Sequence, residues 1–386
     1  MRIVLNGWFL IHHPQTGTGQ YLRALLDWLP QVRPEAEYHL VTPGAFPSPN
    51  SLPAAWQLHA LASGASDLHK LYFEQVLFPR ACQRLRADVA HIPYWAPPLF
   101  FNTAPAVVTI HDLIPRLLPL YRGHVLARTY TALVSAATPR ARLVLADSEA
   151  SRLDILRDLR LPEKKVRRVY LAADRRYRPE GETGADQASR QKYGLPEKYG
   201  LYLGGFDARK NVPALLEAWA QSSIGQHCPL VLGGSVPAPD GRLFADYHAL
   251  TARLGLTEAA KFIGPVDEED KPALYRGAAV FVYPSRYEGF GLPPLEAMAC
   301  GTPVVTTTCA SLPEVVGEAG LVVSPDDIRA LGQAILTCLT EPETAQTLRE
   351  RGLQQARRFT WESTARETAA AYDAVATAYD AAAERP

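Results

Sequence analysis

The sequence has few of the features that define several common classes of protein. Its five cysteines are scattered and odd in number, which argues against a disulfide framework or a zinc site and for a reducing compartment. No stretch offers about 18 uninterrupted apolar residues, so no membrane-spanning helix is predicted. The first ten residues lack the apolar core and the cleavage site of a secretory signal. We therefore expect a cytoplasmic protein, and peripheral contact with the inner face of a membrane stays open.

The charge distribution argues against bulk nucleic-acid binding, but it differs between the two halves of the chain. The formal net charge is zero, yet residues 1–180 contain 22 Lys and Arg against 14 Asp and Glu. No dense basic run or known nucleic-acid motif occurs. A basic first half suits an anionic surface or substrate, although a mixture of solvated faces explains the same count equally well.

Near its N-terminus the sequence contains only part of a dinucleotide-binding fingerprint. The segment T-G-T-G-Q-Y, residues 16–21, places Gly17 and Gly19 between an expected first strand and a helix, and such glycines let a backbone approach a phosphate. The fingerprint needs a third glycine where Leu22 stands, and an acidic residue where Val41 and Thr42 follow the second strand. A dehydrogenase is therefore a weak hypothesis, and a simple turn is the alternative interpretation of the two glycines.

What the sequence does contain is a repeated alternation of short apolar runs with helical patterns. Strand-like runs extend from Ile3–Leu5 to Val166–Tyr170, and again from Gly200–Gly204 to Leu321–Val323. This alternation predicts an α/β protein with two Rossmann-like, doubly wound parallel sheets that bind ligands at the carboxyl ends of their strands. A polar segment separates the two series. We predict a first domain over residues 1–180, a linker over 181–199, a second domain over 200–358 and a C-terminal helix over 359–386.

The most informative segment is S-R-Y-E-G-F-G-L-P-P-L-E-A-M-A-C-G-T-P-V-V, residues 285–305. Pro293 and Pro294 favour a helix start, and Gly301 favours its end. The N–H groups at that start would attract phosphate or hydroxyl groups; they belong to Phe290, Gly291 and Leu292. Glu288 in the loop and Glu296 in the expected first helical turn could accept hydrogen bonds from vicinal hydroxyls. Taken alone, Glu296 is equally well explained as a partner of the helix dipole.

A second segment, Y-L-G-G-F-D-A-R-K-N at residues 202–211, combines a strand, a loop and a helix start. It places Arg209 and Lys210 after the strand, with Gly205 earlier in the same loop. Two fixed cations there could neutralise a leaving diphosphate. Taken alone, the basic pair is better explained as part of a solvated loop.

Together, these two segments resemble the donor-site signature of the family 4 retaining glycosyltransferases, which have the GT-B fold of two Rossmann-like domains facing a cleft. The resemblance implies that Glu288 contacts the transferred sugar and that Glu296 contacts the ribose of the nucleotide. It also implies that Arg209 and Lys210 hold the donor phosphates, with Gly205 beside them.

The same resemblance extends to other parts of the chain. It implies that Gly17 and Gly19 form a loop over the donor phosphates and the acceptor, and that Val266 lies beside the nucleotide base. It implies that the final helix crosses back to the first domain. No D-x-D motif follows a strand to hold a metal ion, so we expect metal-independent transfer without a resident cofactor.

The segment V-T-I-H-D-L, residues 108–113, ends another strand of the first domain. A lone histidine there is usually structural, but the resemblance suggests that His111 lies near the transferred sugar or the acceptor and that Asp112 orients the site. We expect front-face attack, in which the leaving phosphate takes the acceptor proton. Weaker acceptor-site candidates, each with packing or helix capping as the alternative, are Tyr94, Trp95 and Ser148.

We therefore expect a retaining hexosyltransferase that acts on a saccharide or lipid-linked acceptor in polysaccharide assembly. The segments G-G-F-D-A-R-K-N and T-I-H-D-L-I-P resemble those of bacterial mannosyltransferases, which favours GDP-mannose as donor. UDP-glucose or a UDP-N-acetylhexosamine is the alternative donor. A nucleotide-sugar epimerase of the same fold, and a binding module without turnover, are the alternative functions.

Overall fold

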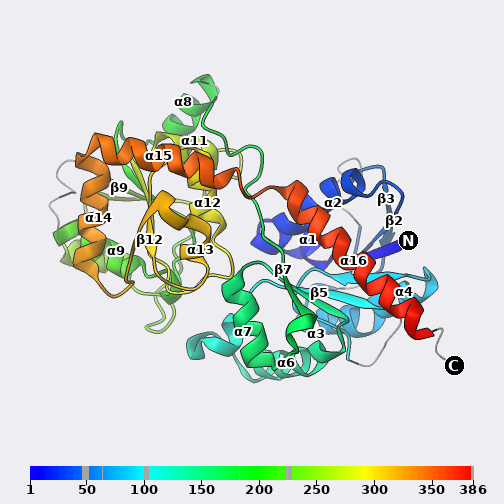
Figure 1. Ribbon diagram of the computed structural model, residues 1–386. Helices are drawn as coiled ribbons and strands as arrows, with labels where there is room; N and C mark the ends of the chain where they lie inside the picture. Colours follow the sequence, from blue (N-terminus) through cyan, green and yellow to red (C-terminus); the bar gives the residue numbers. More distant parts are fainter. Residues whose placement is uncertain are drawn as a thin grey trace. The chain divides into compact units, whose positions relative to one another are not determined.

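The computed structural model describes residues 1–45, 52–62, 64–99, 104–181, 183–221, 224 and 228–383. These residues form two compact units (Figure 1). The first unit combines Met1–Leu171 with Thr360–Pro386, and the second contains Ala172–Phe359. Each unit is built on a parallel sheet covered by helices, so the α/β class predicted from the alternating pattern is confirmed.

The first unit contains a seven-stranded parallel sheet in the order β3-β2-β1-β4-β5-β6-β7. Most of these strands are continuous apolar runs, because helices cover both faces of a parallel sheet. The strands are β1 (Arg2–Asn6), β2 (Glu37–Thr42), β3 (Trp56–Ala60), β4 (Val89–Ile92), β5 (Ala106–Ile110), β6 (Leu143–Ala146) and β7 (Val166–Arg168). Its α-helices are α1 (Trp8–His12), α2 (Gly17–Val32), α3 (Asp67–Tyr72), α4 (Phe78–Arg84), α5 (Ile114–Leu117), α6 (Val125–Ala137), α7 (Glu149–Leu159) and α16 (Trp361–Ala383).

The second unit contains a six-stranded parallel sheet in the order β10-β9-β8-β11-β12-β13. Its strands are β8 (Gly200–Leu203), β9 (Leu230–Gly233), β10 (Ala260–Gly264), β11 (Val280–Tyr283), β12 (Val304–Thr307) and β13 (Gly320–Val323). Its α-helices are α8 (Thr183–Lys192), α9 (Val212–Gln221), α10 (Tyr247–Arg253), α11 (Lys271–Gly277), α12 (Leu292–Ala299), α13 (Leu312–Val316), α14 (Ile328–Thr340) and α15 (Pro342–Ala356).

Three elements differ from the expectations. Strand β3 was not predicted, because its short W-Q-L-H-A sequence has little apolar character and it forms the edge of the sheet. Residues 68–86, whose helical pattern favours one continuous helix, instead form two helices, α3 and α4, joined by the π-helical turn Phe73–Leu77. Residues 181–199, expected as a linker, contain α8, whose Asp186 pairs with Arg276 of α11 within the second unit.

The last helix, α16, packs with the first unit (Figure 1), where it lies beside α2. Buried residues recur along it at helical spacing, so one stripe faces the unit. Thr364 Oγ1 donates to the carbonyl of Tyr170 at 2.6 Å, and Tyr372 Oη lies 2.7 Å from His91 Nδ1. No helix in the described part of the chain is both long and apolar enough to cross a membrane.

Candidate active site

The strand order of the second sheet fixes where a ligand binds. The chain winds outward from β8 through β9 to β10, then returns to place β11 on the other side of β8. In doubly wound sheets the ligand crevice opens at such a switch point, outside the carboxyl ends of the strands. The loop after β8 continues into the 3₁₀ turn Ala208–Lys210, and the loop after β11 continues into α12. The two predicted site segments are therefore neighbours in space.

A buried cluster of three charges joins these loops. The Glu288 Oε1 atom lies 2.7 Å from Lys210 Nζ and 2.7 Å from the Arg209 guanidinium. Ser285 Oγ donates to the same oxygen at 2.6 Å. Each of the three charged side chains is at most 13% exposed. Asp207 Oδ1 also lies 3.6 Å from Arg209 Nε, so two cations are matched by two carboxylates and the formal charge of the group is zero.

The protein backbone holds the cluster in place. Arg286 N–H donates to the carbonyl of Arg209 at 2.8 Å, which fastens one loop to the other. The Arg209 guanidinium also donates to the carbonyl of Tyr287 at 2.8 Å. Ser311 Oγ, at the start of α13, donates to the carbonyls of Glu288 and Phe290. The charged groups are thus pre-positioned by contacts among three loops of this sheet.

Electrostatics keep the carboxylate of this cluster ionised. Burial opposes ionisation of Glu288, but Lys210 and then Arg209 outweigh it and lower the pKa of the carboxyl below its ordinary value. Burial lowers the pKa of Lys210, and the attraction of Glu288 offsets only part of that effect. The Lys210 ammonium is therefore poorly solvated, which strengthens its interaction with an incoming anion.

Helix α12 begins as the prolines predicted, but Glu296 does not lie where it was expected. Gly291 precedes the helix with φ of +110°, a conformation that favours glycine. The first turn contains no acidic residue, because Glu296 is the fifth residue of α12 and belongs to its second turn. There it is buried and accepts a hydrogen bond from Tyr275 Oη at 2.9 Å, and burial raises its pKa to about 7. The interpretation of Glu296 as a helix-dipole partner is therefore wrong.

The remaining predicted donor residues lie in the loops after β8, β10 and β11 or at the start of α12. Phe290 is buried, and its ring centre lies 5.7 Å from that of Phe359. Gly205 is exposed in the loop after β8. Val266 follows β10 and lies beside Gly233, where an added Cβ would come within 3.0 Å of the valine. Leu292 is half-buried as the first residue of α12.

The first unit contains a different polar pair. The switch point of its sheet lies between β1 and β4, and the pair follows the next two strands, β5 and β6. His111 follows β5 and Asp147 follows β6, and the register Ile110↔Ala146 places them opposite each other. His111 Nδ1 lies 2.6 Å from Asp147 Oδ2, and Nε2 lies 3.1 Å from the carbonyl of Pro93. Burial disfavours the imidazolium, but Asp147, with a smaller contribution from Asp112, raises the pKa of His111 above its ordinary value. With an acceptor at each nitrogen, the ring is held as a charged donor.

The glycines near the N-terminus are part of a helix rather than a separate loop. Gly17 is the first residue of α2, and Thr16 caps the helix by accepting from Gly19 N–H at 3.3 Å. An added Cβ at Gly19 would lie 2.5 Å from the carbonyl oxygen of Pro14, so the chain requires glycine there for packing. Gly17 is exposed. The loop predicted over the phosphates is thus an exposed helix N-terminus.

The weaker acceptor-site candidates have structural roles. Tyr94 is a buried core residue, and Ser148 is fully buried and caps α7 by accepting from Ser151 N–H. Both side chains are buried, which favours the packing and helix-capping interpretations of these two residues. Trp95 is half-buried and donates from Nε1 to Thr138 Oγ1 at 2.8 Å. Asp112 Oδ1 accepts from Ile114 N–H at 2.9 Å.

Sequence reasoning missed the residues that hold the predicted ones in place. Asp147 was not predicted as the partner of His111, although its position directly after a strand was the available signal. Ser285 opens the informative segment and was not singled out. Tyr275 lies on another helix, and no local pattern links it to Glu296.

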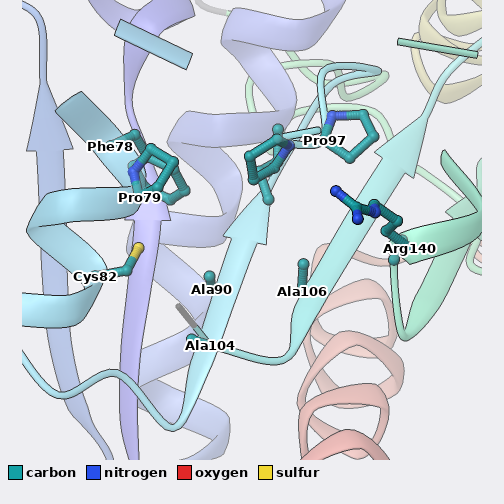
Figure 2. Close-up of a pocket in the computed structure, with 11 residues that line it drawn as sticks. Phe78, Pro79, Cys82, Ala90, Pro97, Ala104, Ala106 and Arg140 are labelled. Atoms are coloured by element: carbon teal, nitrogen blue, oxygen red, sulfur yellow. The ribbon is translucent and has the colours of Figure 1, made fainter. Parts of the chain in front are cut away.

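The first unit also contains a small hollow (Figure 2), and neither His111 nor Asp147 lines it. Its lining is apolar apart from Arg140, and includes Phe78, Pro79 and Cys82. None of the predicted site residues lines it. Within the described residues, no group of three His, Cys, Asp or Glu side chains is placed to hold a metal ion.

The paired doubly wound sheets and the charged cluster at the second switch point define a glycosyltransferase of the GT-B class. Residues 186–355 match the family of glycosyl transferases group 1, and residues 16–176 match Glycosyltransferase Family 4. The O-antigen chain mannosyltransferase B of Escherichia coli is 33% identical over 376 residues, which cover 94% of this chain and 97% of that protein. The chain therefore belongs to the family 4 glycosyltransferases.

Solved structures agree with this assignment. Sucrose-phosphate synthase from Thermosynechococcus elongatus superposes with a TM-score of 0.78 at 25% identity, over 98% of this chain and 100% of that one. The Anabaena protein Alr3699/HepE, crystallised with UDP and glucose, superposes with a TM-score of 0.73 at 21% identity, over 97% and 99% of the two chains. The second likeness supports the fold alone. The predicted GT-B fold and glycosyltransferase class are confirmed.

Proposed function

We propose that this glycosyltransferase transfers mannose from GDP-mannose to a saccharide or lipid-linked acceptor in the assembly of a surface polysaccharide, with retention of configuration and without a metal ion. The observation that carries the proposal is the buried cluster of Arg209, Lys210 and Glu288 at the switch point of the second sheet. The choice of mannose is supported by the relative named as an O-antigen chain mannosyltransferase.

Arg209 and Lys210 stabilise the diphosphate as it leaves. Their charges are fixed in a buried site before the donor arrives, so little reorganisation is needed when negative charge develops on the phosphate oxygen. Glu288 and Asp207 hold the two cations in place, so Arg209 and Lys210 compensate the diphosphate by direct contact and not by a surplus of positive charge. This arrangement supplies within the protein the charge compensation that a divalent cation supplies elsewhere.

The two glutamates orient the donor. A hydroxyl of the sugar donates to Glu288, whose second oxygen remains beside the bond that breaks. A ribose hydroxyl bonds to Glu296, which is held by Tyr275 and can accept in either protonation state. The N-terminus of α12, at Gly291 and Leu292, binds the phosphates through its backbone N–H groups.

Transfer with retention follows from attack on the face from which the leaving group departs. The bond between the anomeric carbon and the phosphate oxygen breaks as the acceptor oxygen bonds to that carbon, and the acceptor proton passes to the leaving phosphate. His111 lies near the acceptor or the sugar and maintains the shape of that site, because its two ring nitrogens bond to Asp147 and to the carbonyl of Pro93. No protein carboxylate is required as a nucleophile in this scheme.

The test is nucleotide release from GDP-mannose, UDP-glucose, UDP-N-acetylglucosamine and ADP-glucose, each offered separately to purified protein in the presence of chelator. We expect release from GDP-mannose alone. Release from a UDP-sugar alone would show that the donor is that UDP-sugar and not GDP-mannose. Release that occurs only without chelator would overturn the proposal that transfer needs no metal ion. Conversion of the donor sugar without nucleotide release would identify the alternative, an epimerase.

The site assignment is tested with Arg209→Ala and Lys210→Ala. Each substitution is expected to lower turnover by about 100- to 1000-fold, because removing one such stabiliser costs about 2.7–4 kcal/mol of barrier. Lys192→Ala is the matched control, since Lys192 forms ion pairs with Asp267 and Asp270 elsewhere in the same unit. Near-normal turnover in both active-site variants, with folding intact, would refute the phosphate assignment.

The proposed localisation is the cytoplasmic face of a membrane, where a lipid-linked acceptor would be presented. The excess of basic residues in the first 180 residues supports contact with an anionic surface.

A further inference from the structure

Exposed apolar side chains of the first unit gather on two segments. Among the described residues, five of the six large apolar side chains with high exposure lie on α3 or on the segment from Pro119 to α6. They are Leu68, Tyr72, Leu120, Val125 and Leu126. Val125 is 76% exposed and Leu126 54%, and both lie in the first turn of α6, whose buried residues Val134 and Ala137 are near its other end. Such a concentration indicates a surface that contacts something other than water.

The two segments are neighbours in the folded unit. The Lys70 Nζ atom of α3 lies 4.9 Å from the centre of the Tyr130 ring on α6. Tyr130 Oη donates to Glu74 Oε2 at 2.8 Å, just after the end of α3. Leu68 and Tyr72 lie one helical turn apart and therefore share a side of α3. The exposed side chains thus belong to one region of the first unit.

The charges in this region have one dominant sign. Residues 113–146 contain five arginines and no Asp or Glu. Arg122, His124 and Arg128 are exposed and alternate with Leu120, Val125 and Leu126. The neighbouring α3 contributes one exposed acid, Asp67, beside His69 and Lys70, and Glu74 is buried. The region is therefore both apolar and cationic.

We propose that this region binds the surface of a bilayer rich in anionic lipids. We call this region the membrane-binding surface of the protein. It consists of the exposed side chains of residues 120–128 together with Leu68 and Tyr72. Aliphatic side chains that alternate with arginines suit an interface in which the apolar groups enter the acyl boundary and the guanidinium groups bind lipid phosphates. The absence of acidic residues from 113–146 makes the charge complementary to anionic headgroups.

Contact through this surface would hold the first unit at the membrane without a spanning segment. The inference does not depend on the identity of the donor, because none of its residues belongs to the proposed active site. Its effect on catalysis would be to raise the local concentration of a lipid-linked acceptor.

The experiment is vesicle flotation of the full chain, with phosphatidylcholine–phosphatidylglycerol vesicles at a ratio of about 3:1 and with pure phosphatidylcholine vesicles. We expect the protein to float with the anionic vesicles only, since each arginine near an anionic surface contributes about a five-fold factor in binding. Val125→Ser with Leu126→Ser, and Arg122→Glu with Arg128→Glu, should each lower the bound fraction by at least about ten-fold.

Two control variants test whether the effect is local. Leu153→Ser removes an exposed leucine of α7 that lies beside Asp154. Arg351→Glu with Arg357→Glu changes the net charge as much as the arginine variant does, but in the second unit. Both controls should bind as the unmodified protein does, and all variants should keep nucleotide release in the absence of vesicles.

Several outcomes would overturn the proposal. These are failure of the unmodified protein to float, equal binding to neutral vesicles, equal losses in the control variants, or unchanged binding in both surface variants. Concentration-dependent dimerisation that Val125→Ser with Leu126→Ser abolishes, without flotation, would assign the surface to a second copy of the chain instead. A failure of donor turnover alone would leave this result unaffected.

Discussion

The two units of this protein share one strand order and use it for different chemistry. Six strands of the first sheet and the six strands of the second follow the same 3-2-1-4-5-6 order. In the second unit, charged side chains meet at the switch point between β8 and β11. In the first unit, the corresponding strand ends carry Asn6 and Tyr94, which are buried, and the charged pair His111–Asp147 lies beyond β5 and β6.

This difference separates what the fold supplies from what the side chains supply. The sheet topology brings the same loop ends together in both units, so it determines where a ligand can bind. The residues placed there decide which ligand. Two cations held by Glu288 and Asp207 suit a diphosphate sugar. The His111–Asp147 pair instead forms a polar wall, since both ring nitrogens of His111 bond within the protein.

The largest expected effect comes from breaking the charge cluster of the second unit. Glu288→Ala leaves Lys210 and Arg209 buried without their carboxylate, and removing one partner of a buried pair typically costs about 3–5 kcal/mol. We expect the second unit to lose about 3 kcal/mol of unfolding free energy, while the first unit changes little. Hydrogen exchange measured by mass spectrometry reports the two units separately.

Glu269→Ala, an exposed glutamate of the same unit, is the control for that measurement. Equal protection of β8 and β11 in Glu288→Ala and in the control would show that the cluster does not stabilise the unit. Addition of nucleotide diphosphate to Glu288→Ala should restore part of the lost protection, because phosphate oxygens replace the missing carboxylate.

Much of this architecture could be predicted from local sequence patterns. The strand-forming runs, the helix start at the two prolines and the location of Glu288, Arg209 and Lys210 after strands are all local features. The contact between Lys210 and Glu288 joins residues 78 positions apart, and the sheet creates it. The burial of Glu296 against Tyr275 and the pairing of His111 with Asp147 rather than Asp112 also depend on tertiary packing, which no local pattern encodes.

A second prediction concerns a feature that the two units share. Glu74 in the first unit and Glu296 in the second are both buried, and burial raises the pKa of each to about 7. A carboxyl whose pKa is raised on folding binds a proton more tightly in the folded state, so stability falls as pH rises from the unfolded value toward 7. Each group is expected to lower the stability of its own unit by roughly 3 kcal/mol between about pH 4.5 and pH 8.

Glu74→Gln and Glu296→Gln test whether each buried glutamate makes its own unit less stable as the pH rises. Each variant should abolish the pH-dependent fall in the unfolding free energy of the unit that contains the substituted glutamate, and leave the other unit unchanged. The unfolding free energy of that unit, relative to the unmodified protein, should therefore be higher at pH 8 than at pH 5. Urea titrations at both pH values, read by pulsed hydrogen exchange at one fixed labelling pH, give the two units separately. A relative stability that does not vary with pH would show that the glutamate is ionised throughout.

The smallest effect should come from the pair in the first unit, and it tests whether His111 is held as a cation. Asp147→Asn replaces a charge-assisted hydrogen bond with a neutral one, at a cost of about 1 kcal/mol. The pKa of His111 should fall, because burial is then opposed only by weaker partners such as Asp112. In the unmodified protein, the stabilisation is complete below the unfolded pKa and is lost as pH rises through the higher folded pKa.

Carbon-detected NMR titration of the imidazole measures that change directly, and Asp112→Asn is the matched comparison. We expect the larger fall in the pKa of His111 from Asp147→Asn, since Asp147 contacts Nδ1 and Asp112 acts through space. An equal or larger fall from Asp112→Asn would show that Asp112, and not Asp147, controls the protonation of His111. If turnover also drops in Asp147→Asn with the donor affinity unchanged, the charged imidazole serves the acceptor side of the reaction, and the division of chemistry between the two units is supported by a functional measurement.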